Sequence, residues 1–377
     1  MKSTSQDLER RLRKAMKPYC RRNTTIGLML FLWDYLAFIA CITMTVIVPI
    51  WWLQLLFATL AGFKIANLAT LSHDAAHNCL TANKRLNSVL GILGFLPGLF
   101  NYRLWRYDHH DVHHSKTNGD HQDSYTPLSL EEFQRLPWYR RLLYRFYRAP
   151  NFVSFGVYYI FERWWQVKFF PRRDMPEEVR RTGWRHFVFL AIYVILFNAL
   201  LVIGSTFTTV SAISAVVFGF VIPFYIFQTL FAFTVYIQHN HERVPWFRHS
   251  NEKRYSPEQA FVSVHLRLPG FFSSLVHNVY EHAAHHVHPG IPCYRLRQAQ
   301  QQLNTLLGDR AVVEDFSLRR IIEIMRHCKL YDYDAHQWVD YHGHPTSVSV
   351  MDPQLSRNTA PPPARNSASG YALVIRE

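Results

Sequence analysis

Four long apolar runs constrain this chain more than any other feature of its sequence. They occur as two consecutive pairs, at about residues 26–48, 51–71, 186–204 and 211–237. Each run is long enough for a helix that crosses the hydrocarbon core of a bilayer, which takes about 20 residues. Asp34 and Lys64 are the only Asp, Glu, Lys or Arg residues within them. The sequence therefore predicts an all-α membrane protein with four transmembrane helices in two hairpins.

Basic segments beside these runs predict the orientation. Residues 1–24 and the stretch 139–148, YRRLLYRFYR, are rich in Arg and Lys, and such segments stay on the cytoplasmic side of a membrane. An even number of spans then places both termini, the 72–185 region and everything after residue 237 on that side. We expect an integral multi-pass protein with a cytoplasmic helical cap, located in the inner membrane if the source is bacterial.

The composition excludes some classes of protein. The 41 Lys and Arg outnumber the 27 Asp and Glu, but the positive charge flanks the spans and forms no separate basic domain, which argues against nucleic-acid binding. The five cysteines contain no CxxC pair, so neither a disulfide framework nor a zinc ribbon is indicated. Pro, Ser and Asn in residues 351–377 predict a disordered tail.

Histidines gather in three short motifs on the predicted cytoplasmic side: HDAAH at 73–77, HDVHH at 110–114 and HAAHH at 282–286. On a helix, residues three and four apart lie on one face. Imidazole nitrogen binds iron, zinc and copper, and one four-coordinate zinc would use at most four such groups. The chain contains no Glu-x-x-His, the motif of soluble di-iron bundles. The pattern predicts two irons held mostly by histidine and able to activate O2.

The three motifs, in this order, resemble the histidine boxes of the membrane fatty acid desaturase family. YIQH at 236–239 is similar to the Val-Gln-His at the end of the family's fourth span, and NVYEHAAHHVHPGIPCYRL at 278–296 resembles its third-box region. The similarity covers about residues 60–296 and is closest to acyl-lipid Δ12 (omega-6) desaturases. It implies a desaturase domain over 25–310, which we expect to be followed by a cytoplasmic helical extension over 311–350.

The resemblance also implies the activity: O2-dependent insertion of a cis double bond into an acyl chain, with two iron ions (Fe2+/Fe3+) as the cofactor. The acyl group would be linked to a lipid, to CoA or to a carrier protein. A separate donor such as ferredoxin or cytochrome b5 would supply electrons, since no fused cytochrome b5 domain is visible. The alternative is a related histidine-box hydroxylase, ketolase or conjugase on an acyl or other apolar substrate. A metal transporter would need more ionisable groups inside the spans.

Carried over residue by residue, the family's metal ligands are His73, His77, His110, His113, His114, His282, His285 and His286. A ninth histidine is expected between the second and third boxes, and His239 is the best placed, with His241 as the alternative. Within the second box a choice remains between two neighbours. The family's Trp stands four residues before its first histidine, which selects His109 after Trp105, whereas the spacing to His113 and His114 selects His110. We favour His110.

Polar residues beside these histidines are candidates for contacts with the ligands. A carboxylate can accept the second ring N–H of a metal-bound histidine and so fix its tautomer; a surface or helix-capping role is the alternative for each. Asn278, four residues before His282, is a candidate to hold a metal-bound water or to bind the metal, with core packing or a helix-end hydrogen bond as the alternative. The candidate carboxylates are Asp74, Asp108, Asp111, Asp120, Asp123 and Glu281.

Overall fold

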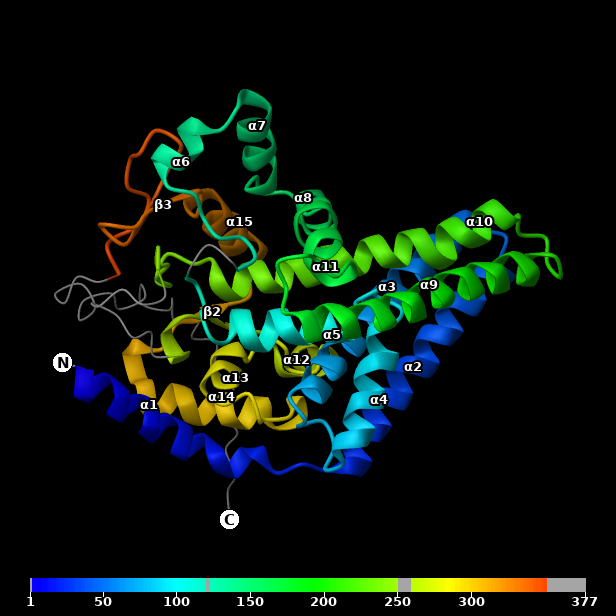
Figure 1. The fold of residues 1–377 in the computed structure, drawn as a ribbon, viewed down its shortest axis with the longest axis horizontal. Coiled ribbons are helices and arrows are strands. Elements are labelled where there is room, and N and C mark those ends of the chain that lie inside the picture. The colour runs from blue at the N-terminus through cyan, green and yellow to red at the C-terminus, as the bar shows by residue number, and fades with distance from the viewer. Residues whose placement is uncertain (1, 120–122, 250–258, 351–377) are drawn as a thin grey trace, which may run out of the picture.

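The computed structural model describes residues 2–119, 123–249 and 259–350, and the fold is mostly helical (Figure 1). Four of its helices are long and apolar enough to cross a membrane: α2 (Thr24–Ile47), α3 (Trp51–Ala76), α9 (Glu177–Ser205) and the continuous helix Ala212–His239. The last one consists of α10 (Ala212–Val216), the π-turn η4 (Val217–Val221) and α11 (Ile222–His239). The four helices form two consecutive pairs, which confirms the predicted arrangement.

The long helices differ in how much protein surrounds them. α3 is the most buried of the four and α9 the least, and α3 packs against both α2 and α11. Leu68 and Leu71 of α3 and Phe227 of α11 are completely buried. By contrast, Trp33 and Leu36 of α2 are more than 60% exposed, as expected for side chains that contact lipid.

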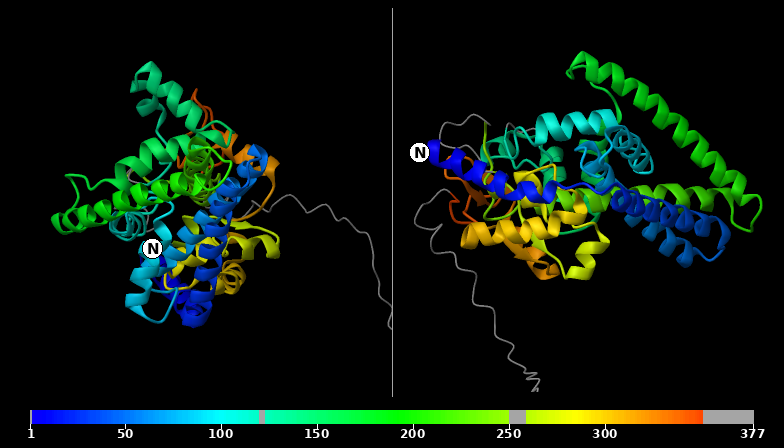
Figure 2. Two further views of the ribbon diagram at one scale, coloured as in Figure 1. Left: turned by 90° about the vertical axis from the view of Figure 1, so that its right-hand side faces the viewer. Right: turned by 90° about the horizontal axis from the view of Figure 1, so that it is seen from below.

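The long helices project at one end of the molecule, and the other elements gather at the opposite end (Figures 1 and 2). Between the two pairs lie short helices whose first residues are often capped; Asn101, for example, accepts a hydrogen bond from the backbone N–H of Leu104. The elements of this region are α4 (Lys84–Phe95), α5 (Tyr102–Tyr107), the π-helix η2 (Asp108–His113), α6 (Leu130–Arg135), α7 (Trp138–Tyr147), α8 (Val153–Tyr158) and the π-helix η3 (Tyr159–Phe169).

The same end contains the N-terminal helix and the elements after α11. Only two small sheets occur among the described residues: β1 pairs with β2 in parallel, and β3 with β4 antiparallel. The elements are α1 (Lys2–Met16), η1 (Lys17–Cys20), η5 (Gln259–Phe261), β1 (His265–Arg267), α12 (Gly270–Leu275), α13 (His282–Val287), α14 (Cys293–Leu307), η6 (Gly308–Arg310), β2 (Val313–Asp315), α15 (Leu318–His327), β3 (Leu330–Asp332) and β4 (Gln337–Val339).

Residues 311–350 are not the helical extension that the sequence predicts. They contain one helix, α15, and the strands β2, β3 and β4. The physical reason is the alternation of aromatic residues in the last part: Tyr331 and Trp338 are opposite each other in the β3–β4 pair, with ring centroids 5.2 Å apart. Cross-strand aromatic pairs stabilise a hairpin. The predicted tail, 351–377, lies outside the described residues.

Candidate metal centre

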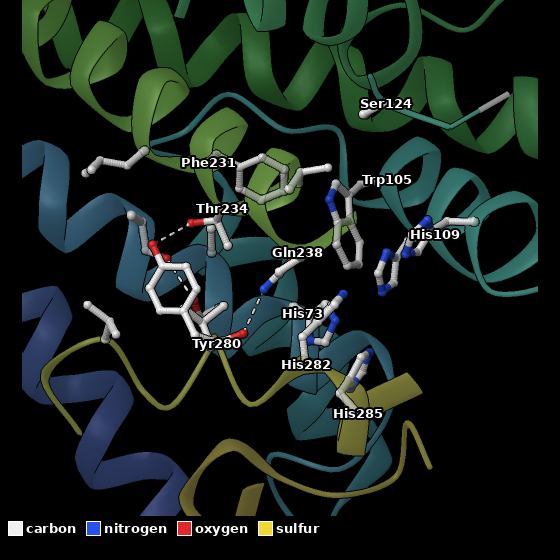
Figure 3. A pocket seen from close by; sticks show the side chains of 18 of the residues that line it. His73, Trp105, His109, Ser124, Phe231, Thr234, Gln238, Tyr280, His282 and His285 are labelled. Atoms are coloured by element: carbon white, nitrogen blue, oxygen red, sulfur yellow. Dashed lines mark hydrogen bonds between the residues drawn. The ribbon is translucent and has the colours of Figure 1, made fainter. Parts of the chain in front are cut away.

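Nine histidines from four segments converge into two groups at the end of the long helices. The segments are the end of α3, the π-helix η2 with the residue that follows it, the end of α11, and α13. The first histidine group is His73, His77, His109, His114 and His285, and the second histidine group is His113, His239, His282 and His286. Within each group the potential ligand nitrogens all lie within 4.8 Å of one another. Figure 3 shows His73, His109, His282 and His285 around one pocket.

The distances between imidazole nitrogens are those of ligands that share an ion. In the second group, His282 Nε2 lies 3.2 Å from His239 Nε2 and 3.0 Å from His286 Nε2. In the first group, His114 Nε2 lies 3.1 Å from both His109 Nε2 and His285 Nε2. Two nitrogens that bind one metal at about 2.1 Å are separated by roughly 3 Å.

Hydrogen bonds at the other ring nitrogen direct lone pairs into these groups. His239 Nδ1 donates to the carbonyl of Val262 (3.0 Å), and His113 Nδ1 to Asp123 Oδ1 (2.6 Å). A neutral imidazole that donates through Nδ1 carries its lone pair on Nε2. Nε2 of His77 is buried without a hydrogen-bond partner. Converging lone pairs repel each other unless a cation lies between them, so the residues fit a metal at each group.

Burial keeps these imidazoles neutral, which is the form that binds metals. Desolvation, reinforced by the neighbouring imidazoles, lowers the pKa well below its usual value for His77, His109, His114, His282, His285 and His286. Since the ligand form of histidine is the neutral ring, no proton has to be displaced at neutral pH.

Eight of the nine histidines predicted as ligands lie in these groups, and the exception is His110. Its ring stacks on His77, with centroids 4.2 Å apart, and it belongs to neither group. His109 occupies the place in the first histidine group that was predicted for His110. The physical reason is the π-helix η2, in which His114 N–H donates to His109 O, five residues earlier (3.1 Å). α-Helical spacing selects the residue four before His114, but a π-turn brings the fifth into register.

Asp74 and Asp123 are the two predicted carboxylates that contact ligand histidines through a ring nitrogen. Asp74 Oδ1 lies 3.1 Å from His73 Nδ1, and its Oδ2 accepts from the backbone N–H of Cys293. Asp123 receives a second hydrogen bond, from the N–H of Asn118 (2.8 Å). Burial raises the pKa of Asp123, but the neighbouring His113 imidazole outweighs this and the pKa is lowered overall. Asp123 is therefore an anion that holds the His113 ring.

The other predicted neighbours have different contacts. Asp111 is exposed and lies outside both histidine groups. Glu281 is buried and accepts from Ser273 Oγ (2.8 Å), and burial raises its pKa to about 7. Asn278 donates to the carbonyl of Cys293 (2.9 Å) and its Oδ1 lies 3.1 Å from Ser273 Oγ, so its amide is engaged away from the histidines. His241 contacts Glu314 (3.0 Å). Asp120 lies outside the described residues.

Sequence reasoning missed the partners of Asp108. This buried carboxylate contacts Lys168 Nζ and, at 3.5 Å, Arg163 Nη2, both from η3. The two cations lie about sixty residues further along the chain and belong to no recognisable motif, so only the tertiary fold could reveal them. Because Asp108 is the first residue of η2, the ion pairs connect the π-helix to η3 directly behind His109.

One pocket reaches both histidine groups. It contains about 1210 Å³ of empty space, including its open part, and six of the nine histidines line it. Charged side chains lie on the histidine side: Asp74, Asp108, Asp123, Arg163 and Lys168. Away from the histidines the lining is mostly apolar and comes from α3, α11 and the segment before α13: Phe63, Ala66, Ala69, Leu230, Phe231, Val235, Val276, Val279 and Tyr280.

Comparison with known proteins agrees with this site. Residues 49–316 match the family described as Fatty acid desaturase. The chloroplastic omega-6 fatty acid desaturase of Spinacia oleracea is 28% identical over 287 residues, which are 76% of this chain and 61% of that protein. The sn-1 oleoyl-lipid 12-desaturase of Picosynechococcus sp. is 24% identical over 308 residues, or 82% of this chain and 85% of that protein.

A third relative, the sn-1 acyl-lipid omega-3 desaturase (ferredoxin) of Synechocystis sp., is 25% identical over 271 residues and covers 69% of both chains. The chain spans about three fifths of the length of the chloroplastic relatives. The family match takes in all three histidine motifs, and the predicted resemblance is confirmed. The chain belongs to the fatty acid desaturase family.

Proposed function

We propose that this chain is a membrane fatty acyl desaturase that introduces a cis double bond into an acyl chain, with two iron ions as cofactor and O2 as co-substrate. The observation that carries the proposal is the pocket, which reaches both histidine groups at one end and is apolar at the other. Such a pocket brings a hydrocarbon chain beside both histidine groups, where an oxidant formed from O2 would reach adjacent methylenes.

The polarity of the pocket orients the substrate. An ester or carboxyl group would lose its hydration at the apolar end, between Phe63 and Phe231, and find no charged partner there. Methylenes and the terminal methyl lose nothing by entering that end and gain about 0.8 kcal/mol per buried CH2. The methyl end of the acyl chain therefore occupies the apolar end, and the reacting carbons lie beside the histidines.

In this proposal the first and second histidine groups each hold one iron through imidazole nitrogens. Bound iron would supply the activation of O2, with electrons from a separate protein. The protein's own residues do the rest. Asp74, Asp123 and the carbonyl of Val262 fix the rings of His73, His113 and His239, and such contacts are worth 10–100-fold in metal affinity. Burial of the site excludes water, which protects the C–H reaction from side reactions.

Relatives support a finer assignment. Several are named omega-6 or oleoyl-lipid 12-desaturases, so we assign Δ12/omega-6 regiochemistry on lipid-linked acyl groups. One is named as ferredoxin-dependent, and ferredoxin is accordingly the proposed type of electron donor, with cytochrome b5 as the alternative. We place both termini and the histidine boxes on the cytoplasmic side, in the inner membrane if the source is bacterial.

The test is expression in a host that lacks the activity, followed by analysis of fatty-acid methyl esters and of iron in the purified protein. New cis-unsaturated esters and about two irons per chain are expected, and a His285→Ala variant should make no new unsaturated ester. A hydroxylated, oxidised or conjugated product would assign the alternative chemistry. Protein without iron, or full desaturation by His285→Ala, would overturn the proposal.

A further inference from the structure

A hydrogen bond crosses the pocket between α11 and the segment before α13. Thr234 Oγ1 and Tyr280 OH lie 3.2 Å apart, and both residues line the pocket. Figure 3 shows the two side chains facing each other on the side of the pocket away from His73, His282 and His285. Neither residue belongs to a histidine group, so neither is a candidate metal ligand.

The segment that carries Tyr280 is held in place on both sides. Gln238 Nε2 donates to the carbonyl of Val279 (2.8 Å), which attaches the segment to α11. Asn67 Nδ2 donates to the carbonyl of Leu275 (2.9 Å), and His277 Nε2 lies 2.5 Å from Asp34 Oδ2, which attach it to α3 and α2. His277 and Asn278 both have left-handed backbones (φ 52° and 54°), a conformation that costs energy for non-glycine residues. Tyr280 is thus positioned by the surrounding structure.

The bridge lies on α11 before its histidine end, which is His239. Thr234 precedes His239 by five residues on the continuous helix α11, or about 7.5 Å at 1.5 Å per residue. Beyond the bridge the lining continues to Phe231 and Leu230, and on α3 to Phe63.

We propose that the Tyr280–Thr234 bridge is the stop for the methyl end of the acyl chain, so that it determines how many carbons separate the methyl end from the new double bond. The inference rests on the proposed function and names its specificity-determining pair. Opening the stop admits more carbons beyond the metals and moves the double bond toward the carboxyl end.

The experiment compares double-bond positions in the fatty-acid methyl esters made by the full chain and its variants. Tyr280→Ala and Thr234→Ala each open the bridge and should raise the ratio of double bonds on the carboxyl side of the wild-type position. Because one methylene in an apolar pocket changes the preference between two substrates by at least about tenfold, we expect this ratio of double-bond positions to change by a factor of about ten. Thr234→Leu narrows the pocket and should favour positions nearer the methyl end. Tyr193→Ala, on α9 and outside the lining, is the matched control.

The ratio is measured among the products that a variant makes, so a slower enzyme does not change it. If Tyr280→Ala yields no product, the two Thr234 variants decide the question from the opposite wall. The proposal would be overturned if every variant that makes product keeps the wild-type double-bond positions. It would also be overturned if Tyr193→Ala changes the ratio of positions as much as the bridge variants do. Absence of any new double bond with the wild-type chain contradicts the proposed function itself, which is a distinguishable result.

Discussion

The neighbouring histidines His109 and His110 differ in what their rings contact. His109 lies beside Trp105, with stacked rings 4.5 Å apart, and its Nε2 faces His114. The ring of His110 stacks on that of His77 and belongs to neither histidine group. Counting from Trp105 selects His109, whereas α-helical spacing to the last two histidines of the box selects His110. The two rules conflict because η2 is a π-helix, whose turn contains one residue more than a turn of an α-helix. Single-turn π-helices occur often at functional sites.

The two neighbours therefore provide a matched pair of variants. His109→Ala removes a nitrogen from the first histidine group and should lower iron affinity at least about tenfold, the lower end of what the loss of a supporting contact alone costs. His110→Ala should keep iron near the wild-type level. The measurement is iron per chain after dialysis against a graded chelator. Equal losses in the two variants would show that the position of η2 is not the one described.

At the scale of the elements, the end of α11 is held by a cluster of charges from the C-terminal part of the chain. Glu242, three residues after His239, forms a double contact with Arg320 of α15 (2.8 and 3.0 Å) and a contact with His327 (2.9 Å). His241 and Glu314 of β2 join the same cluster. α15 therefore supports the histidine end of α11, although it contributes no histidine to either group.

This cluster predicts a pH dependence of stability. Burial raises the pKa of Glu242, but His241, Arg320 and His327 outweigh it and lower the pKa from 4.5 to about 2. A depressed carboxyl pKa stabilises the fold above the unfolded pKa, and the contribution is lost as pH falls from about 4.5 toward 2. The effect is on the order of 3 kcal/mol. The Glu242→Gln variant lacks this stabilising contribution at every pH.

Thermal unfolding of wild type and Glu242→Gln between pH 7 and pH 3 measures this effect. The wild type should unfold at higher temperature at neutral pH, and the difference should shrink below pH 4.5. Glu131→Gln, at an exposed position of α6 with a surface contact to Arg135, is the control and should follow the wild type. A difference that stays constant with pH would rule out the carboxylate of Glu242 as its source.

At the scale of the whole molecule, the two helix pairs place the connections 48–50 and 206–211 at the end opposite the histidines (Figure 1). The proposed orientation puts these connections outside the cytoplasm and α7, with its exposed Arg141, inside. Thr206→Cys, in a background with Cys20 and Cys41 replaced by Ser, should react with a membrane-impermeant thiol reagent on intact cells. Arg141→Cys should react only after permeabilisation. The reverse pattern would invert the orientation.

How far the fold and site could be predicted depends on whether the signal is local. Span lengths, the two pairs and the three histidine motifs are visible in the sequence because hydropathy and ligand spacing are properties of short segments. Predicting a helical extension over 311–350 was wrong where alternating aromatics form the β3–β4 hairpin. Asn278 and Asp111, chosen for their nearness in sequence to ligands, have side chains directed elsewhere.

By itself, then, the sequence determined the class of protein, the four membrane helices, the supply of imidazole ligands and the family. Only the tertiary structure decided how nine histidines divide into two groups, that His109 and not His110 joins them, that Lys168 and Arg163 support η2, and that Tyr280 meets Thr234 across the pocket. These features depend on distances between segments up to about two hundred residues apart. No periodicity within a segment encodes such distances, because packing of the whole chain sets them.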